Sequence, residues 1–279
     1  YAPQGEMGLW SSCPHVKFID QDSKGAYWIG TYNGGINHYD PVSNTLSHYY
    51  HEPENSGSLK SDQVYTFLED HQGRIWIGNL PGGLHKLDPS LHKFKIYTSD
   101  ANTGESLSNN NIMGIYEAPT QPGIIWLGTR GGGLNRLDKK TGKFQYYRHQ
   151  SQEKHSISSD IVWTTYEDRE GIFYVGTEAG LDTLNQETGQ FAPYKIIENN
   201  QHSSISFPVI RIHQDRQGWL WLGTWSGGMI RLSKDKKTVK RYQFSTANPQ
   251  TFYNSVIEIF EDTRGKIWVG IFQNGLFEY

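Results

Sequence analysis

The chain repeats one short sequence six times at a nearly constant interval, and this repeat constrains its fold more than any other feature. Each copy has an aromatic residue, an aliphatic residue and a glycine, usually followed by threonine, and a second glycine comes a few positions later. The copies begin at Trp28, Trp76, Trp126, Tyr174, Trp221 and Trp268. Successive copies are therefore 48, 50, 48, 47 and 47 residues apart, an interval typical of repeat architectures such as propellers.

Each repeat contains four short strand-like segments that are separated by turn residues. In the first repeat these segments are 16–22, 27–32, 36–40 and 46–50, lengths that strands prefer. An Asp-x-x-Gly turn precedes every aromatic anchor except the third, where the corresponding turn, 117–123, is two residues longer. Glycines also follow each anchor, and glycine reaches the positive φ of a tight hairpin at low cost.

This pattern predicts an all-β fold, a β-propeller of four-stranded antiparallel blades. A unit of about 48 residues cannot bury both of its faces alone, so neighbouring units must stack. Radial stacking gives a propeller, in which the aromatic anchors fill the space between blades. We expect a single domain, 1–279, with blades near 16–50, 62–97, 110–147, 160–194, 207–242 and 254–279. A parallel solenoid is the alternative, but its turns need about 20 to 30 residues.

Closure of the propeller stays open at this point. The sixth repeat stops before its fourth strand, so the N-terminal segment would have to supply that strand if six blades close. In the other arrangement the repeats come from a longer propeller, seven-bladed or double, and the abrupt ends favour this second arrangement.

Composition narrows the function. The 279 residues carry a net charge of −3, which gives no electrostatic drive toward nucleic acid. The single cysteine, Cys13, has no partner for a disulfide. The eleven histidines show no zinc-binding spacing, and no nucleophile elbow, phosphate loop or dinucleotide fingerprint occurs. We therefore expect no cofactor, no metal and no catalytic residue, and we interpret the five turn aspartates as acceptors of turn amides.

Positions that differ between repeats point to ligand binding. The residue directly after the anchor sequence lies at the tip of the hairpin between the second and third strands, and we call it the tip residue. The six tip residues are Tyr32, Leu80, Arg130, Glu178, Trp225 and Phe272. All except Leu80 are candidate ligand contacts, because aromatic faces and a few fixed charges suit a sugar or a peptide. The alternative is that these side chains pack on their own loops or on a neighbouring domain.

Two further features lie near the tips. The crossings between repeats are long and variable, at 51–61, 99–110, 149–160, 196–206 and 243–254, and long loops on a rigid scaffold often bind ligands. The most polar column of the first strands is expected to line a central channel. It consists of Phe18, Thr66, Gly114, Thr164, Arg211 and Glu258. We expect Arg211 and Glu258 to pair.

The repeat resembles that of the two-component regulator propeller family. The copies starting at Asp70 and Asp215 match its pattern well, Asp-x-x-Gly-x-aliphatic-Trp-aliphatic-Gly followed by Gly-Gly-Leu. The altered third turn, Tyr174 in place of Trp and Ile271 in place of Thr depart from it. The resemblance implies an extracytoplasmic, periplasmic sensor region of a membrane-anchored histidine kinase or hybrid protein, or of a diguanylate cyclase.

For this chain the resemblance implies binding without catalysis. The expected partners are an oligosaccharide ligand, the downstream signalling domains of the same chain and a second copy in a homodimer. Two rival classes stay open. One is a propeller lyase or hydrolase, for which Arg130, Glu178 and His51 are the nearest candidates, and the other is a surface assembly module such as a secretion-system component.

Overall fold

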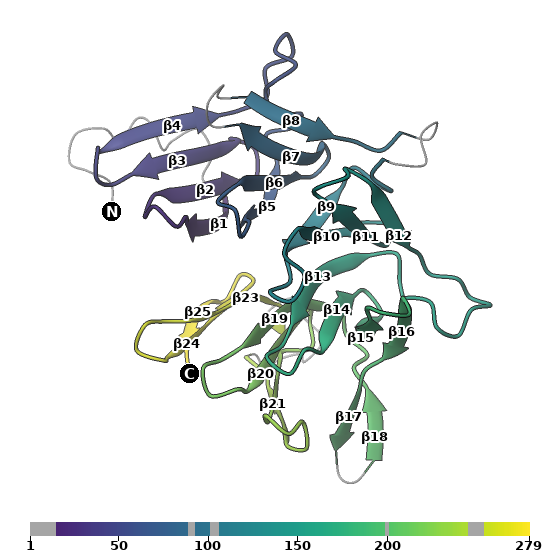
Figure 1. The fold of residues 1–279 in the computed structure, drawn as a ribbon. Helices are drawn as coiled ribbons and strands as arrows, with labels where there is room; N and C mark the ends of the chain where they lie inside the picture. Colours follow the sequence, from purple (N-terminus) through teal and green to yellow (C-terminus); the bar gives the residue numbers. More distant parts are fainter. Residues whose placement is uncertain (1–14, 89–92, 101–105, 199–200, 245–253) are drawn as a thin grey trace. The chain divides into compact units, whose positions relative to one another are not determined.

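The computed structural model describes residues 15–88, 93–100, 106–198, 201–244 and 254–279, all of which form strands, turns and loops without an α-helix. The single cysteine, Cys13, and most of the predicted crossing 243–254 lie outside these described residues. The chain divides into two compact units (Figure 1). Unit 1 comprises the described parts of Tyr1–Glu117, Gln121–Gly131 and Asn135–Tyr146, and unit 2 those of Ala118–Thr120, Gly132–Leu134 and Tyr147–Tyr279.

Unit 1 contains three four-stranded sheets, apart from the end residues Leu134 and Tyr147 of the third sheet, and the strands of each sheet follow one another in chain order. The first sheet has β1 (Val16–Gln21), β2 (Tyr27–Thr31), β3 (Ile36–Asp40) and β4 (Thr45–Tyr49). The second has β5 (Val64–Glu69), β6 (Ile75–Asn79), β7 (Gly83–Asp88) and β8 (Lys93–Tyr97). The third has β9 (Ile112–Tyr116), β10 (Ile124–Thr129), β11 (Leu134–Asp138) and β12 (Phe144–Tyr147).

Unit 2 contains two four-stranded sheets, a three-stranded sheet and a separate hairpin. The fourth sheet has β13 (Val162–Glu167), β14 (Phe173–Thr177), β15 (Gly180–Asn185) and β16 (Gln190–Pro193). The hairpin has β17 (Lys195–Glu198) and β18 (Gln201–Ser204). The fifth sheet has β19 (Val209–Gln214), β20 (Leu220–Thr224), β21 (Met229–Leu232) and β22 (Val239–Tyr242), and the sixth has β23 (Val256–Glu261), β24 (Ile267–Ile271) and β25 (Gly275–Glu278).

Neighbouring sheets within each unit pack face to face as propeller blades. The first strand of a sheet lies against the first and second strands of the sheet before it, as β5 does on β1 and β2, and β19 on β13 and β14. Apolar side chains fill the space between these sheets, and the anchors Trp76, Tyr174 and Trp221 are almost fully buried there. The predicted β-propeller fold of antiparallel blades is therefore confirmed, whereas the single domain over 1–279 stays a prediction.

The hairpin glycines are required by close backbone contacts as well as by their φ angles. Gly35 and Gly228 have φ angles of 66° and 77°. A β-carbon added at either position would lie 2.1 Å from the carbonyl oxygen of the last fourth-strand residue, Tyr49 or Tyr242. Any larger residue would therefore separate the third strand from the fourth.

One crossing differs from its prediction. The segment 196–206 was expected to be a long loop, but most of it forms the β17–β18 hairpin, with Ile196 paired to Ser203. Ile196 and Ile205 are buried in the core of unit 2, so the hairpin is anchored to the sheet packing. The buried side chain of Ile196 holds β17 against this core.

Candidate functional site

The six tip residues share one backbone hydrogen bond. The N–H of each donates to the carbonyl of the residue directly before the first strand of its own sheet, at 2.9 to 3.0 Å. Tyr32 donates to His15 and Glu178 to Ile161, for example. This bond places every tip beside the beginning of a first strand, so the two segments form one surface.

A β-bulge lies at the same place in every first strand. The pairing register skips one residue between, for example, Val162 and Thr164, and an extra residue of this kind bends the strand and redirects a side chain. We call the skipped residues the bulge residues. They are Lys17, Tyr65, Met113, Trp163, Ile210 and Ile257. These positions also vary between repeats, with five residue types at six positions.

In unit 2, bulge and tip residues form a row of three aromatic rings, Trp163, Trp225 and Phe272, which we call the unit 2 row. The ring centroids of Trp163 and Trp225 are 6.4 Å apart and their planes differ by 7°. The centroids of Trp225 and Phe272 are 5.5 Å apart, at 41°. Both distances lie within the range of interacting aromatic pairs, about 4.5 to 7 Å. All three side chains are partly exposed.

Glu178 orients the first ring of this row. Its carboxylate oxygen Oε2 accepts a hydrogen bond of 2.8 Å from the indole Nε1 of Trp163. The Glu178 side chain is exposed, and within the described part of the chain it makes no ion pair. The row therefore combines flat apolar faces with a negative charge at one edge.

In unit 1, the same positions form a different cluster, Lys17, Tyr32 and Tyr65, which we call the unit 1 row. The Lys17 ammonium lies 5.2 Å from the ring centroid of Tyr32 and 5.0 Å from that of Tyr65, within the limit of about 6 Å for a cation–π contact. Tyr32 is 40% exposed. Here the chain supplies its own cation to the aromatic faces.

The five predicted ligand contacts are thus only partly brought together. Trp225 and Phe272 touch, and Glu178 joins them through Trp163, which the sequence did not single out. Tyr32 contacts Lys17 instead of another predicted residue. Arg130 is exposed and is held by its backbone bond to Asn111. The variable column of bulge residues was the signal that would have identified Trp163, Lys17 and Tyr65.

The expected pairing of Arg211 with Glu258 is confirmed, whereas the lining of a channel by this column stays a prediction. Arg211 Nε lies 3.2 Å from Glu258 Oε2, with side chains 33% and 54% exposed. Each of these residues directly follows a bulge residue, Ile210 or Ile257. These two charges pair with each other, and Glu178, which bonds Trp163 of the unit 2 row, makes no ion pair among the described residues.

The turn aspartates at the opposite end of the strands are structural acceptors. In Asp215, Oδ1 accepts the backbone N–H of Trp219 at 2.8 Å and Oδ2 accepts the indole N–H of Trp221 at 2.7 Å. Four of the aspartates bond an anchor indole in this way, and Asp168 accepts the Tyr174 hydroxyl at 3.0 Å instead. The interpretation of these residues as turn acceptors is confirmed.

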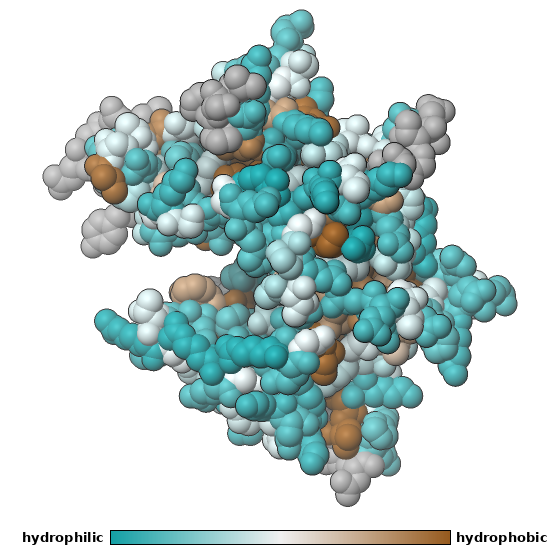
Figure 2. Space-filling view, in the orientation of Figure 1, coloured by the Kyte–Doolittle hydropathy of each residue, from teal (hydrophilic) through white to brown (hydrophobic). Residues whose placement is uncertain are grey.

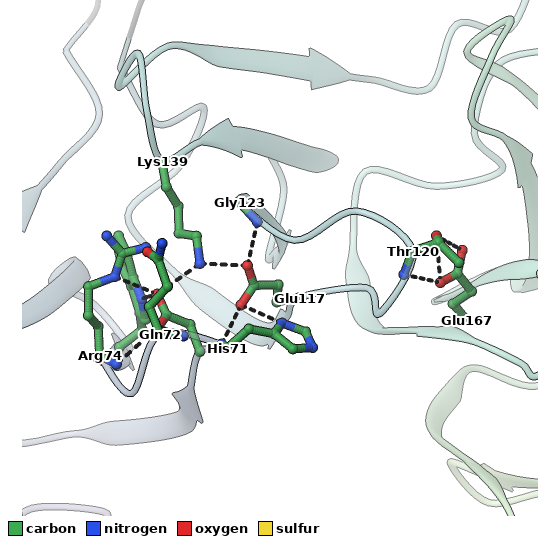
Figure 3. A network of polar contacts seen from close by, with 10 residues as sticks. His71, Gln72, Arg74, Glu117, Thr120, Gly123, Lys139 and Glu167 are labelled. Atoms are coloured by element: carbon green, nitrogen blue, oxygen red, sulfur yellow. Dashed lines mark hydrogen bonds and ion pairs between the residues drawn. The ribbon is translucent and has the colours of Figure 1, made fainter.

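The third turn lacks this aspartate, and an ion cluster lies beside it (Figure 3). Lys139 Nζ contacts Glu117 Oε1 at 2.5 Å and Asp70 Oδ2 at 2.9 Å, and all three side chains are at most 4% exposed. Burial raises the pKa of Asp70, but its hydrogen bonds from Trp76, Lys139 and Arg74 outweigh this and hold the pKa below its usual range. The cluster is a buried ion network within unit 1.

The loop histidines of the first and third crossings also have structural partners. His51 Nδ1 lies 2.7 Å from the carbonyl of Leu59, and His149 Nδ1 lies 2.8 Å from that of Ile157. Among the residues that the structure describes, no group of three His, Cys, Asp or Glu side chains has the arrangement of a metal site. Within the same residues, no helix has the length and apolarity to cross a membrane.

The visible surface is mainly hydrophilic. Figure 2 shows apolar residues on this face only in small, separate groups. Small apolar groups among polar side chains are normal on a protein surface.

Comparisons with known proteins agree with the repeat. Residues 58–80 and 205–226 match the model of the two component regulator propeller. No protein with a curated description matches the sequence.

Solved structures with similar folds have different functions. The extracellular domain of a protein described as a hybrid two component system, BT3049 from B. thetaiotaomicron, is 22% identical, with a TM-score of 0.65 over 95% of this chain and 40% of that one. PorZ, a surface component of the type-IX secretion system of Porphyromonas gingivalis, is 15% identical, with a TM-score of 0.69 over 95% and 38%. An inactive variant of virginiamycin B lyase from Staphylococcus aureus is 15% identical, with a TM-score of 0.62 over 95% and 84%.

The chain thus spans about two fifths of the length of the first two of these structures. At these identities the likeness establishes the fold alone, and the two matched segments lie in sheets of different units. The chain is therefore a β-propeller, and two of its segments match the repeat of the two component regulator propeller.

Proposed function

We propose that this propeller is the extracytoplasmic, ligand-sensing region of a membrane-anchored two-component sensor and that its ligand is an oligosaccharide. The observation that carries the proposal is the unit 2 row, three partly exposed aromatic rings at positions that vary between repeats. A scaffold role would favour the same residue in every blade, as at the anchors. Sugar rings offer apolar C–H faces that stack on such side chains, and hydroxyls that need a few fixed polar groups.

The sensor role rests on the family repeat and on a fold shared with an extracellular domain of a hybrid two component system. A ligand signals only if it binds one arrangement of the sensor more tightly than another. The output module would be a histidine kinase in the same parent chain, acting as a homodimer.

A thermal-shift screen of the chain against linear oligosaccharides tests the proposal, with calorimetry for each hit. A ligand that binds only the native state raises the melting temperature in proportion to the logarithm of its concentration. We expect at least one glycan to do so and Trp225→Ala to lose that shift. If no glycan shifts the melting temperature, the assembly alternative gains, and the next step is a search for protein partners.

A further inference from the structure

We infer that the unit 2 row binds an uncharged, linear glycan, with Trp163 as a direct contact and Glu178 as the residue that positions it. This inference rests on the proposed function and deepens it. Trp163, a bulge residue, becomes a ligand contact, Glu178 becomes a positioning residue instead of a contact, and the ligand is limited to neutral sugars.

The geometry of the row favours a chain over a single sugar. Its three rings follow one another at 6.4 and 5.5 Å, so successive sugar rings of one chain can each meet an aromatic side chain. Trp163 and Trp225 are nearly parallel, at 7°, and they come from different sheets, at a bulge in β13 and at the tip after β20. Each is fixed by its own backbone register, so the row exists before a ligand binds.

The hydrogen bond between Glu178 and Trp163 explains the parallel arrangement. An indole has a single donor, Nε1–H, and Glu178 accepts from it at 2.8 Å. This bond fixes the rotation of the Trp163 ring about its side-chain bonds. Glu178 therefore acts on the ligand through Trp163, as a positioning residue.

The charge of Glu178 sets the selectivity. It is exposed and makes no ion pair within the described residues, and in the same unit Arg211 and Glu258 pair with each other. An anionic sugar on the row would face this unpaired carboxylate, and like charges repel. We therefore expect neutral glycans to bind and uronate glycans of the same length to bind weakly.

Calorimetry on the whole chain tests these points with neutral tetrasaccharides of glucose, xylose and mannose and with the galacturonate tetrasaccharide. We expect one neutral tetrasaccharide to bind, Trp163→Ala to weaken it by about tenfold or more, and the galacturonate probe to bind at least about tenfold more weakly than the neutral one. The matched control is Phe260→Ala, an aromatic of the same unit that is 58% exposed and lies outside the row, and it should leave the affinity unchanged.

Two variants of Glu178 separate positioning from charge. Glu178→Gln keeps an acceptor for the indole N–H, so it should retain neutral-glycan affinity within about threefold and improve the affinity for galacturonate. Glu178→Ala removes the acceptor and should weaken neutral-glycan binding by about three- to tenfold. The melting temperature of each variant without ligand confirms that it is folded.

The outcomes distinguish this inference from the proposed function. If no tetrasaccharide binds the wild-type chain, the oligosaccharide proposal fails and this inference fails with it. If one binds and Trp163→Ala binds it equally well, only the assignment to the unit 2 row is overturned. Equal losses in Glu178→Gln and Glu178→Ala would overturn the positioning role and indicate a direct contact by the charged carboxylate.

Discussion

The two ends of the strands in each blade follow opposite rules. At the turn end, the same side chain has the same task in sheet after sheet, as Asp70 and Asp215 show by bonding an anchor indole. At the tip end, the backbone geometry repeats but the side chains do not. The unit 1 row contains a lysine over two tyrosines, whereas the unit 2 row contains three neighbouring aromatic rings. Uniform side chains stabilise the scaffold, whereas varied ones on a uniform backbone can specify a ligand.

The turn end also links neighbouring repeats. In each of the five later repeats, a Glu or Gln at or directly after the end of the first strand accepts a backbone N–H from the turn of the preceding repeat, 45 to 47 positions earlier. These contacts are Ser23 to Glu69, His71 to Glu117, Thr120 to Glu167, Arg169 to Gln214 and Arg216 to Glu261. Substitutions at this end should therefore affect stability more than substitutions at the tips, and the following predictions test that difference.

The largest loss is expected for Lys139→Ala. This change leaves the carboxylates of Asp70 and Glu117 buried without their shared cation, and breaking a buried ion pair costs about 3 to 5 kcal/mol. Urea unfolding measures the loss, with Lys140→Ala, an exposed neighbour, as the control. Equal unfolding midpoints for the two variants would show that the ion cluster does not stabilise the turn end.

Asp215→Ala should lower the free energy of unfolding by about 3 kcal/mol, because it leaves the buried indole N–H and a backbone N–H without acceptors, at about 1 to 3 kcal/mol each. Asp215 is 4% exposed. Asp262→Ala removes the corresponding bonds, including the one to Trp268 at 3.1 Å, from a more exposed position and should cost less. A loss in Asp262→Ala as large as that in Asp215→Ala would refute burial as the cause.

Stability should also depend on pH through His85, which lies in β7 between the two ends. Burial lowers the pKa of His85 to about 4, while an unfolded histidine titrates near 6.5. Between these two pH values the unfolded chain binds more protons than the folded chain. The stabilisation that depends on neutral His85 is therefore complete above about pH 6.5, and it decreases by up to about 3 kcal/mol as the pH drops to 4.

His85→Asn tests this directly. The His85 ring accepts the backbone N–H of Lys60 at 3.1 Å, and Asn135, at the same position of the next sheet, accepts that of Ser108 at 2.9 Å. The asparagine should therefore keep the hydrogen bond and remove the pH dependence. Thermal melts between pH 4 and 7 should show a smaller slope for the variant, and an unchanged slope would assign the effect to other groups.

The smallest effect is expected at the tip end, for Lys17→Met. The methionine retains the apolar stem but loses the ammonium over Tyr32 and Tyr65, a contact worth about 0.5 to 1 kcal/mol at an exposed site. A double-mutant cycle with Tyr32→Leu, followed by urea unfolding, measures the coupling. A coupling energy larger than the loss of stability in Asp215→Ala would contradict the distinction between the two ends.

Much of the fold could be predicted from local patterns. The interval of 48 residues, the alternation of apolar positions and the turn glycines are all short-range signals, and they predicted the blades, the structural role of the turn aspartates and the pair Arg211 and Glu258. The hairpin β17–β18 was missed, because a crossing was expected to stay a loop. The apolar residue Ile196, which is buried in the core of unit 2, was the available signal.

The sequence by itself therefore determined the architecture, since each strand and turn depends on residues a few positions apart. Only the tertiary structure decided which variable residues meet. Trp163 contacts Trp225 although 62 positions separate them, and the sequence pattern does not show that a bulge residue meets a tip residue of another sheet. The physical reason is that the bulge redirects one side chain and the packing of adjacent sheets sets its neighbour, so the row arises from three-dimensional register.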